Sequence, residues 1–315
     1  MTTTPMAMAN RQRLHLMWRK TVNVVMLGMT GVLTLLTAGV LLFILGYLAV
    51  KGAQSVNWWT FLFNLPQPPG EPGGGVANAI MGSAKMLALA VCIGFPIGFL
   101  AGVYLSEYGY GFYPSLIRYV ADLLNGVPSI VTGIFVYTLF YLLVKPSEVF
   151  SGWAGSVALG VMLAPLVVRS TEDCLRTVPM ELREGAMALG APKWRVIFFV
   201  VVPAAASGIF TALMLGFARI AGETAPLLFT ATGNLLHWSK MSEPTESLTV
   251  LIYNFATGPD PDWHRQAWAA GFLLLLLVLV INLAARLIVP RLGAILRLFA
   301  RFILRPIGRL LGLAT

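Results

Sequence analysis

The stretch that decides the fold is EGAMALGAPKWRVIFFVVVP, residues 184–203, which lies between two long apolar runs. Residues 180–189 are good helix formers, and Glu184 is one of two acidic residues near their start, where a helix dipole favours anions. Gly190 suits the position just after a helix end, and Pro192 suits the first turn of a new helix. The sequence therefore predicts two helices at an angle, the first lying along a membrane surface and the second entering the membrane.

The composition indicates a membrane protein. The chain has 315 residues, of which 57% are hydrophobic and only 11% are charged, and its mean hydropathy is +0.79. A soluble domain carries about 25% charged residues, so a soluble protein is excluded. The net charge of +9 does not indicate a nucleic-acid partner, because the basic residues are sorted by loop as membrane topology requires. The two cysteines and three histidines show no metal-ligand spacing, and we predict no metal site.

Six apolar segments are candidates for membrane spans, since a bilayer core is crossed by about 20 apolar residues. They are residues 24–50, 79–106, 116–144, 153–168, 204–222 and 267–289. The fourth segment is short, and Pro165 near its end predicts a kink or an early exit. In the second segment a small residue recurs every fourth position and predicts close approach of another helix; these residues are Ala90, Gly94, Gly98 and Gly102.

Basic residues predict the orientation of the spans. One set of loops holds 16 of the 22 lysines and arginines, the other set holds four, and two lie inside spans. Cytoplasmic loops carry the excess of positive charge, so both termini and residues 184–203 are predicted to be cytoplasmic. The loop 66–75 and the polar stretch 231–266 are then external.

The predicted fold class is all-α, a polytopic helix bundle with six transmembrane helices. A cytoplasmic N-terminal segment, residues 1–20, precedes the six-span domain, residues 21–289, which contains a cytoplasmic loop at 173–203. A basic tail, residues 290–315, repeats arginine at a spacing of four among apolar residues. That spacing predicts an amphipathic helix anchored on the anionic lipid of the inner leaflet.

Residues 184–203 resemble the EAA loop of ABC-importer permeases. That motif reads E-A-A, three residues, G, nine residues, then I-x-L-P, and its counterparts here are Glu184-Gly185-Ala186, Gly190, Val200, Val202 and Pro203. The resemblance implies a type I ABC importer permease fold and a coupling helix that docks into a cleft of an ATP-binding subunit. The docking residues implied are Glu184, Gly185, Ala186, Leu189 and Gly190.

The chain itself is predicted to be a transport subunit and not an enzyme. It contains no Gly-Lys pair, so it cannot form a P-loop. We therefore expect no cofactor on this chain, with ATP and magnesium bound by a separate ATPase subunit.

Two intramembrane polar features are candidates for a substrate pathway. Arg219 and Glu223 lie four residues apart on one helix face in the outer part of the fifth span. A charge buried in the membrane costs about 2.5–3.5 kcal/mol on insertion scales, so its presence indicates a function. The planar guanidinium of arginine suits phosphate oxyanions. The other interpretation is a structural ion pair. Asn125 and Ser129 flank Pro128 inside the third span. Either the backbone groups that the proline leaves without a helical hydrogen bond line a cavity, or the proline only kinks the helix.

The resemblance narrows at residues 219–231, RIAGETAPLLFTA, which are similar to the PstA permease family of phosphate importers. Three more stretches resemble that family: GGVANAIMGS at 74–83, NGVPSIV at 125–131 and SLTVLIY at 247–253. The resemblance covers about residues 20–290 and implies a substrate pathway that includes Arg219, Glu223, Thr224, Ser129 and Asn125.

This resemblance also implies a location and partners. The chain would lie in the bacterial inner membrane and form half of the pathway for inorganic phosphate with a homologous PstC-like permease. Two copies of an ATPase subunit would sit below it, and a periplasmic phosphate-binding protein would deliver substrate from above. The alternatives are a permease for another oxyanion or an amino acid, an ion-driven secondary transporter, which predicts inverted repeats that are not seen, and a non-transporting scaffold or sensor.

Overall fold

The computed structural model describes residues 5–144, 149–235 and 237–310, which form helices and connecting loops with no strand among them. Five helices are long and apolar enough to cross a membrane, and one bent pair brings the number of spans to six. The six-span helical bundle predicted from the sequence is thereby confirmed. The five long helices are α1 (Pro5–Gln54), α3 (Ala77–Glu107), α6 (Gly152–Arg176), the helix Lys193–Ala221, and α12 (Pro261–Leu310).

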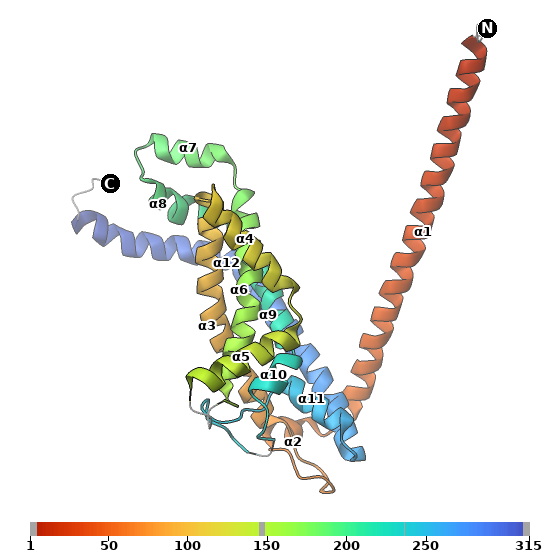
Figure 1. Cartoon of the computed structure of the whole chain (residues 1–315), viewed down its shortest axis with the longest axis vertical. Coiled ribbons are helices and arrows are strands. Elements are labelled where there is room, and N and C mark those ends of the chain that lie inside the picture. Colours follow the sequence, from red (N-terminus) through yellow and green to blue (C-terminus); the bar gives the residue numbers. More distant parts are fainter. Residues whose placement is uncertain (1–4, 145–148, 236, 311–315) are drawn as a thin grey trace.

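Glycines hold α3 and α6 together at the centre of the bundle (Figure 1). A Cβ at Gly94 would lie 2.7 Å from the carbonyl oxygen of Gly160, and a Cβ at Gly98 would lie 2.6 Å from that of Ala164. Gly102 meets α6 in the same way, with the Val168 carbonyl oxygen 2.7 Å from its would-be Cβ. The predicted small-residue stripe therefore faces α6 and sets how closely the two backbones approach.

The third span is broken rather than kinked. Its two halves are α4 (Phe112–Gly126) and α5 (Ser129–Leu143), which meet at an angle of 107°. Val127 and Pro128 between them have extended backbone, with ψ of 130° and 136°. The expectation of a simple proline kink in one helix over 116–144 is thus wrong, because proline offers no N–H to continue the helix and both residues leave it.

The fourth span is longer than predicted. The apolar pattern ends at Val168, but α6 runs on for two further turns to Arg176 and passes Pro165 without a break. Those turns are polar and are stabilised by charge contacts with α4. A search of the sequence for apolar segments does not detect them.

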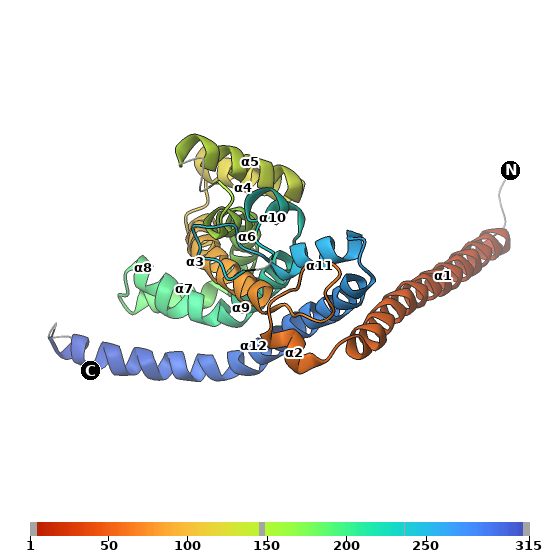
Figure 2. The same ribbon diagram turned by 90° about the horizontal axis from the view of Figure 1, so that it is seen from below.

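Both ends of the chain extend away from the bundle. Figure 2 shows α1 leaving on one side and the end of α12 on the other, with α4 and α5 covering a different flank. Every side chain from His15 to Ile44 is exposed, and α1 packs only through its last turns, where a Cβ at Gly52 would lie 2.4 Å from the Cβ of Phe272. The predicted N-terminal segment is helical from Pro5 onward and continuous with the first span.

The C-terminal tail continues α12 as helix as far as Leu310. The side chains that would form its predicted amphipathic face lie outside the described residues. Residues 311–315 lie outside them as well. Figure 1 places the start of α1 and the end of α12 at the same end of the molecule as α7 (Met180–Ala188). This agrees with an even number of crossings and with both termini on one side.

The opposite end of the bundle is built from short helices. They are α2 (Trp58–Phe63), α10 (Ala225–Thr230) and α11 (Leu248–Thr257), the last of which lies within the stretch 231–266 that was expected to be a polar external loop. Ser247 caps α11, and Ser83 of α3 accepts a 2.8 Å hydrogen bond from the Leu248 N–H. Leu251 and Phe255 of α11 are buried in an apolar core shared with α12.

A continuous helix joins the cytoplasmic loop to the outer end of the fifth span. It comprises α8 (Lys193–Val196), a π-helical turn (Ile197–Val201) and α9 (Val202–Ala221). Pro203 is the second residue after the π-helical turn. The wider turn accommodates the missing proline N–H without ending the helix.

Candidate functional site

The predicted coupling helix is α7, which lies across the end of the bundle (Figure 1). It ends where expected, because Gly190 has a φ of +82°, which favours glycine. The Ala191 N–H bonds the Ala186 carbonyl at 3.3 Å, and the Gly190 N–H bonds that of Met187 at 2.9 Å. These two bonds form a Schellman motif, which turns the chain sharply toward Pro192.

Most of the predicted docking residues lie on the free surface of α7. Glu184, Gly185 and Gly190 are exposed, and Leu189 is 90% exposed. Ala186 differs, because it is half-buried and packs against the apolar cluster that includes Leu175 and Val196. Its small size allows α7 to pack on its own bundle, and its part in docking stays a prediction.

Contacts that the sequence analysis missed tie α7 to the ends of α3 and α6. The Arg183 guanidinium donates to the Leu175 carbonyl at 2.8 Å and pairs with the Glu107 carboxylate at 2.9 Å. Lys193 donates to the Glu107 carbonyl at 2.8 Å and lies over the Tyr108 ring, 4.2 Å from its centroid. The start and the end of the loop 180–193 are therefore both fixed to the last turn of α3.

The predicted pathway charges meet at the outer end of α9. The Arg219 Nε lies 3.9 Å from a Glu223 carboxylate oxygen, and the two side chains are 52% and 20% exposed. This separation is at the limit of an ion pair and is longer than a charge-assisted hydrogen bond. Glu223 thus lies close enough to orient the arginine, while most of the guanidinium donors remain free.

A break in the backbone positions this pair. Helix α9 ends at Gly222, whose N–H bonds the Arg219 carbonyl at 3.2 Å, and Thr224 then begins α10. The Thr249 hydroxyl of α11 donates to the Glu223 carbonyl at 3.0 Å and holds the connecting residues in place. Three elements therefore converge on the segment that carries Arg219, Glu223 and Thr224.

The other predicted pathway residues lie on α4 and α5, of which α5 packs near the same region. Helix α5 packs on α10, where a Cβ at Gly133 would lie 2.7 Å from the Cα of Pro226. Asn125 and Ser129 are half-buried on either side of the α4–α5 break. Within the described residues, no hydrogen bond joins either of them to Arg219 or Glu223, so the structure brings α5 to this region but does not join the side chains.

An ionic cluster at the cytoplasmic end of the bundle was also missed. The Glu172 side chain of α6 is 1% exposed, and its carboxylate lies 2.7 Å from Arg118 and from Arg176 and 3.3 Å from Arg169. Arg169 also pairs with Asp122 of α4. The spacing from Arg169 to Glu172 to Arg176 is that of ion pairs on a helix, and this signal could have revealed part of the cluster.

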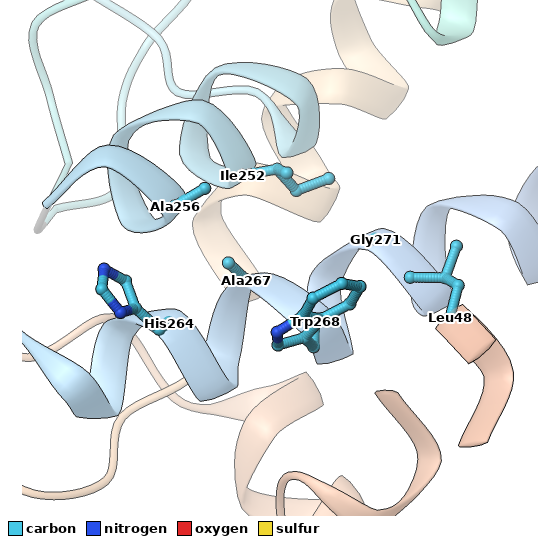
Figure 3. Close-up of a pocket in the computed structure, with 7 residues that line it drawn as sticks. All are labelled: Leu48, Ile252, Ala256, His264, Ala267, Trp268 and Gly271. Carbon is cyan, nitrogen blue, oxygen red and sulfur yellow. The ribbon is translucent and has the colours of Figure 1, made fainter. Parts of the chain in front are cut away.

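An apolar pocket of about 350 Å³ lies between α1, α11 and α12 (Figure 3). Leu48, Ile252 and Trp268 are among its lining residues, and His264 is the titratable residue that Figure 3 shows among them. The His264 Nε2 lies 2.8 Å from the Gly258 carbonyl. The lining is mostly apolar, in contrast with the charged region of Arg219.

Comparison with known proteins identifies the family. Residues 94–294 match the family described as binding-protein-dependent transport system inner membrane component. The phosphate transport system permease protein PstA of Haemophilus influenzae is 44% identical over 282 residues, which cover 89% of this chain and 98% of that protein. The chain belongs to the PstA family. The PstA protein of Yersinia pestis is 43% identical over 272 residues, covering 86% of this PstA-family chain and 91% of the relative.

Solved structures with a similar fold are ABC transporter chains. A chain of the bacterial alginate ABC transporter, solved in complex with an alginate-bound periplasmic protein, matches with a TM-score of 0.58 and 16% identity. The match covers 90% of this PstA-family chain and 97% of that chain. A chain of the inward-facing MetNI methionine transporter matches with a TM-score of 0.52 and 19% identity over 69% and 94%. The predicted ABC permease fold and inner-membrane location are thereby confirmed for this PstA-family chain.

Proposed function

We propose that this chain is the permease subunit of an ATP-driven phosphate importer and forms half of its translocation pathway. The observation that carries the proposal is the half-exposed Arg219 beside Glu223, at the outer end of a helix that begins directly after α7. The high similarity to proteins named as phosphate transport system permeases supports phosphate as the substrate. Arg219 gives that similarity a chemical basis, because a planar guanidinium matches the oxygens of a phosphate anion.

Arg219 is the main phosphate contact in this proposal. Its Nε faces Glu223, which leaves the two terminal nitrogens for a bidentate contact with phosphate. Glu223 keeps the local charge near neutral, so that the anion is attracted without being held too tightly to leave. Thr224, Asn125 and Ser129 supply neutral polar groups around the same point.

The chain requires partners to perform transport. We assign it a homologous PstC-like permease as the other half of the pathway, two copies of an ATPase subunit that bind ATP and magnesium, and a periplasmic phosphate-binding protein. The exposed apolar side chains of α1 from His15 to Ile44 suit both lipid and a second permease. The family description, with its binding-protein dependence, supports the periplasmic partner. This chain would catalyse no chemical step itself.

Coupling in this proposal is mechanical. The exposed residues Glu184, Gly185, Leu189 and Gly190 dock α7 into the ATPase subunit. Helix Lys193–Ala221, which is 29 residues or about 43 Å long, then transmits the movement toward Arg219 near its outer end. Closure of the ATPase pair would tilt this helix and alternate the access of the pathway.

Arg219→Ala tests the proposed function. The full complex with its partner subunits is placed in proteoliposomes, with binding protein and phosphate outside and ATP inside, and phosphate uptake is measured. We expect uptake to fall at least tenfold while the subunits still co-purify and hydrolyse ATP. Arg219→Lys should restore only part of the uptake, because lysine keeps the charge and loses the planar fork.

Arg265→Ala is the matched control. Arg265 is another outer-side arginine in a short-range pair, with Asp262, and its side chain is 66% exposed. Uptake by this variant should stay within twofold of the wild type. Equal uptake by the Arg219→Ala and Arg265→Ala variants would remove Arg219 from the pathway. Uptake of an amino acid in place of phosphate by the wild-type complex would overturn the substrate.

A further inference from the structure

A polar groove lies between α6 and α9, on the cytoplasmic side of Arg219. Its volume is about 510 Å³, and its lining includes Ser170, Asp173 and Cys174 from α6 and Ser207, Thr211 and Leu215 from α9. None of these residues belongs to the Arg219–Glu223 pair or to the coupling helix. Such a concentration of polar groups between two membrane-spanning helices is costly in contact with lipid.

A stripe of exposed residues on α9 leads from the groove toward Arg219. Ser207, Thr211, Leu215 and Arg219 follow one another at intervals of four residues, so each lies about 40° further around the helix than the one before. All four are exposed in this chain. The 12 residues from Ser207 to Arg219 span about 18 Å of helix, and over this length the stripe winds by about 120° from the groove to the arginine.

The polar groups of the groove are available to a solute. Within the described residues, the Ser170 and Ser207 hydroxyls form no hydrogen bond and Asp173 forms no ion pair. The Thr211 hydroxyl donates to the Ser207 carbonyl at 2.8 Å, and rotation of its side chain redirects that donor into the groove. An exposed carboxylate without a cation requires water, so Asp173 marks a wet cytoplasmic mouth.

Leu215 separates the groove from Arg219. It is 61% exposed and lies one turn from Arg219 on the same face, with Thr211 one turn further toward the cytoplasm. An apolar side chain between two polar sections of a narrow path stops conduction by excluding water.

We propose that the groove between α6 and α9 is the cytoplasmic half of the phosphate pathway, with Leu215 as the apolar barrier between it and Arg219. This inference rests on the proposed function and adds the exit route to it. Neutral hydroxyls donate to phosphate oxygens without a fixed positive charge, so the anion is held weakly and leaves. Asp173 at the mouth disfavours binding of the anion there, so phosphate is not retained at the exit.

Thiol labelling tests the wetness of the groove. Thr211→Cys is introduced into a chain with Cys92→Ser and Cys174→Ser, and the full complex is studied in inverted vesicles with a charged, membrane-impermeant methanethiosulfonate. We expect labelling without nucleotide, and at least tenfold slower labelling once vanadate traps the closed ATPase. The matched control is Thr34→Cys in α1, whose native hydroxyl makes the same bond, 2.8 Å to the Thr30 carbonyl, outside the groove.

Transport measurements test the passage of phosphate. Thr211→Val should lower phosphate uptake at least fivefold with ATP hydrolysis retained, whereas Thr34→Val should leave uptake within twofold of the wild type. Leu215→Ser should raise ATP-independent phosphate leak at least fivefold, which a misfolded subunit that fails to co-purify would not do.

The outcomes separate the groove from the proposed function. Labelling of Thr211→Cys at the rate of Thr34→Cys, insensitive to vanadate, would overturn the groove even if Arg219→Ala abolished uptake. Normal uptake by Thr211→Val together with an unchanged leak through Leu215→Ser would overturn it as well. Failure of the wild-type complex to carry phosphate would refute phosphate as the cargo, while vanadate-sensitive labelling would still support an aqueous exit route.

Discussion

Replacing Glu172 with alanine is expected to destabilise the cytoplasmic end of the bundle by about 3 kcal/mol. Loss of one partner from a buried ion pair typically costs about 3–5 kcal/mol, because the other charge stays buried and uncompensated. The Arg118 side chain is 21% exposed and keeps bonds to the Leu105 and Gly109 carbonyls at 2.9 and 3.2 Å. Those bonds place the expected cost at the lower end of the range.

The other two arginines around Glu172 add little to this cost. Arg169 retains its contact with Asp122, and Arg176 is 56% exposed, so that water replaces the lost carboxylate. An exposed ion pair contributes about 0–1 kcal/mol. Arg176→Ala is therefore the matched control, because it removes an exposed partner of the same carboxylate and should cost under about 1 kcal/mol.

Unfolding of the purified chain in mixed micelles by increasing SDS, followed by tryptophan fluorescence, measures the difference. Glu172→Ala should shift the midpoint far more than Arg176→Ala, and Glu172→Gln should fall between them. Equal midpoints for Glu172→Ala and Arg176→Ala would refute the reasoning, because they would mean that water or lipid headgroups compensate Arg118 as well as the carboxylate does.

Two further predictions concern the outer loops and the coupling helix. Burial raises the pKa of Glu246 from 4.5 to about 7, so the folded state holds its proton more tightly and stability should fall as pH rises from about 4.5 to 7. Melting curves at pH 5 and pH 8 should show that the Glu246→Gln variant loses about 3 kcal/mol less stability between these pH values than the wild type. Parallel stability–pH profiles for the variant and the wild type would contradict the burial argument. Gly190→Val strains a residue with a φ of +82°, and phosphate uptake should fall at least fivefold with ATP hydrolysis retained. Gly70→Val, at a φ of +89° in an outer loop and with no atom within 4 Å of its would-be Cβ, is the control, and equal uptake by both variants would argue against α7 as the coupling element.

The sequence predicted the features that depend on local pattern. The six spans follow from apolar length, and the stripe at Gly94, Gly98 and Gly102 follows from spacing along one helix face. The end of α7 at Gly190 follows from the conformational freedom of glycine, and the approach of Arg219 to Glu223 follows from helical periodicity. In each case the interacting residues are close in sequence or share one helix.

Features that depend on contacts between distant elements were not predictable in this way. Pro128 predicts a disturbance in the third span, but packing of Gly133 on Pro226 helps to place the 107° bend. The polar end of α6 is helical because Glu172 has partners on α4, which no local pattern contains. The inward position of Ala186 likewise depends on core residues from other helices.

The π-helical turn Ile197–Val201 fixes the rotational phase between the coupling end and the pathway end of one long helix. Each residue of an α-helix advances the side-chain direction by roughly 100°, so deleting one residue from this turn would rotate Arg219 and the rest of α9 by about that angle. Helix α7 and its docking surface would remain unchanged, yet the arginine would point to a different neighbour. Chain length within this turn is therefore a design constraint in its own right, and chimeric permeases should be joined outside it.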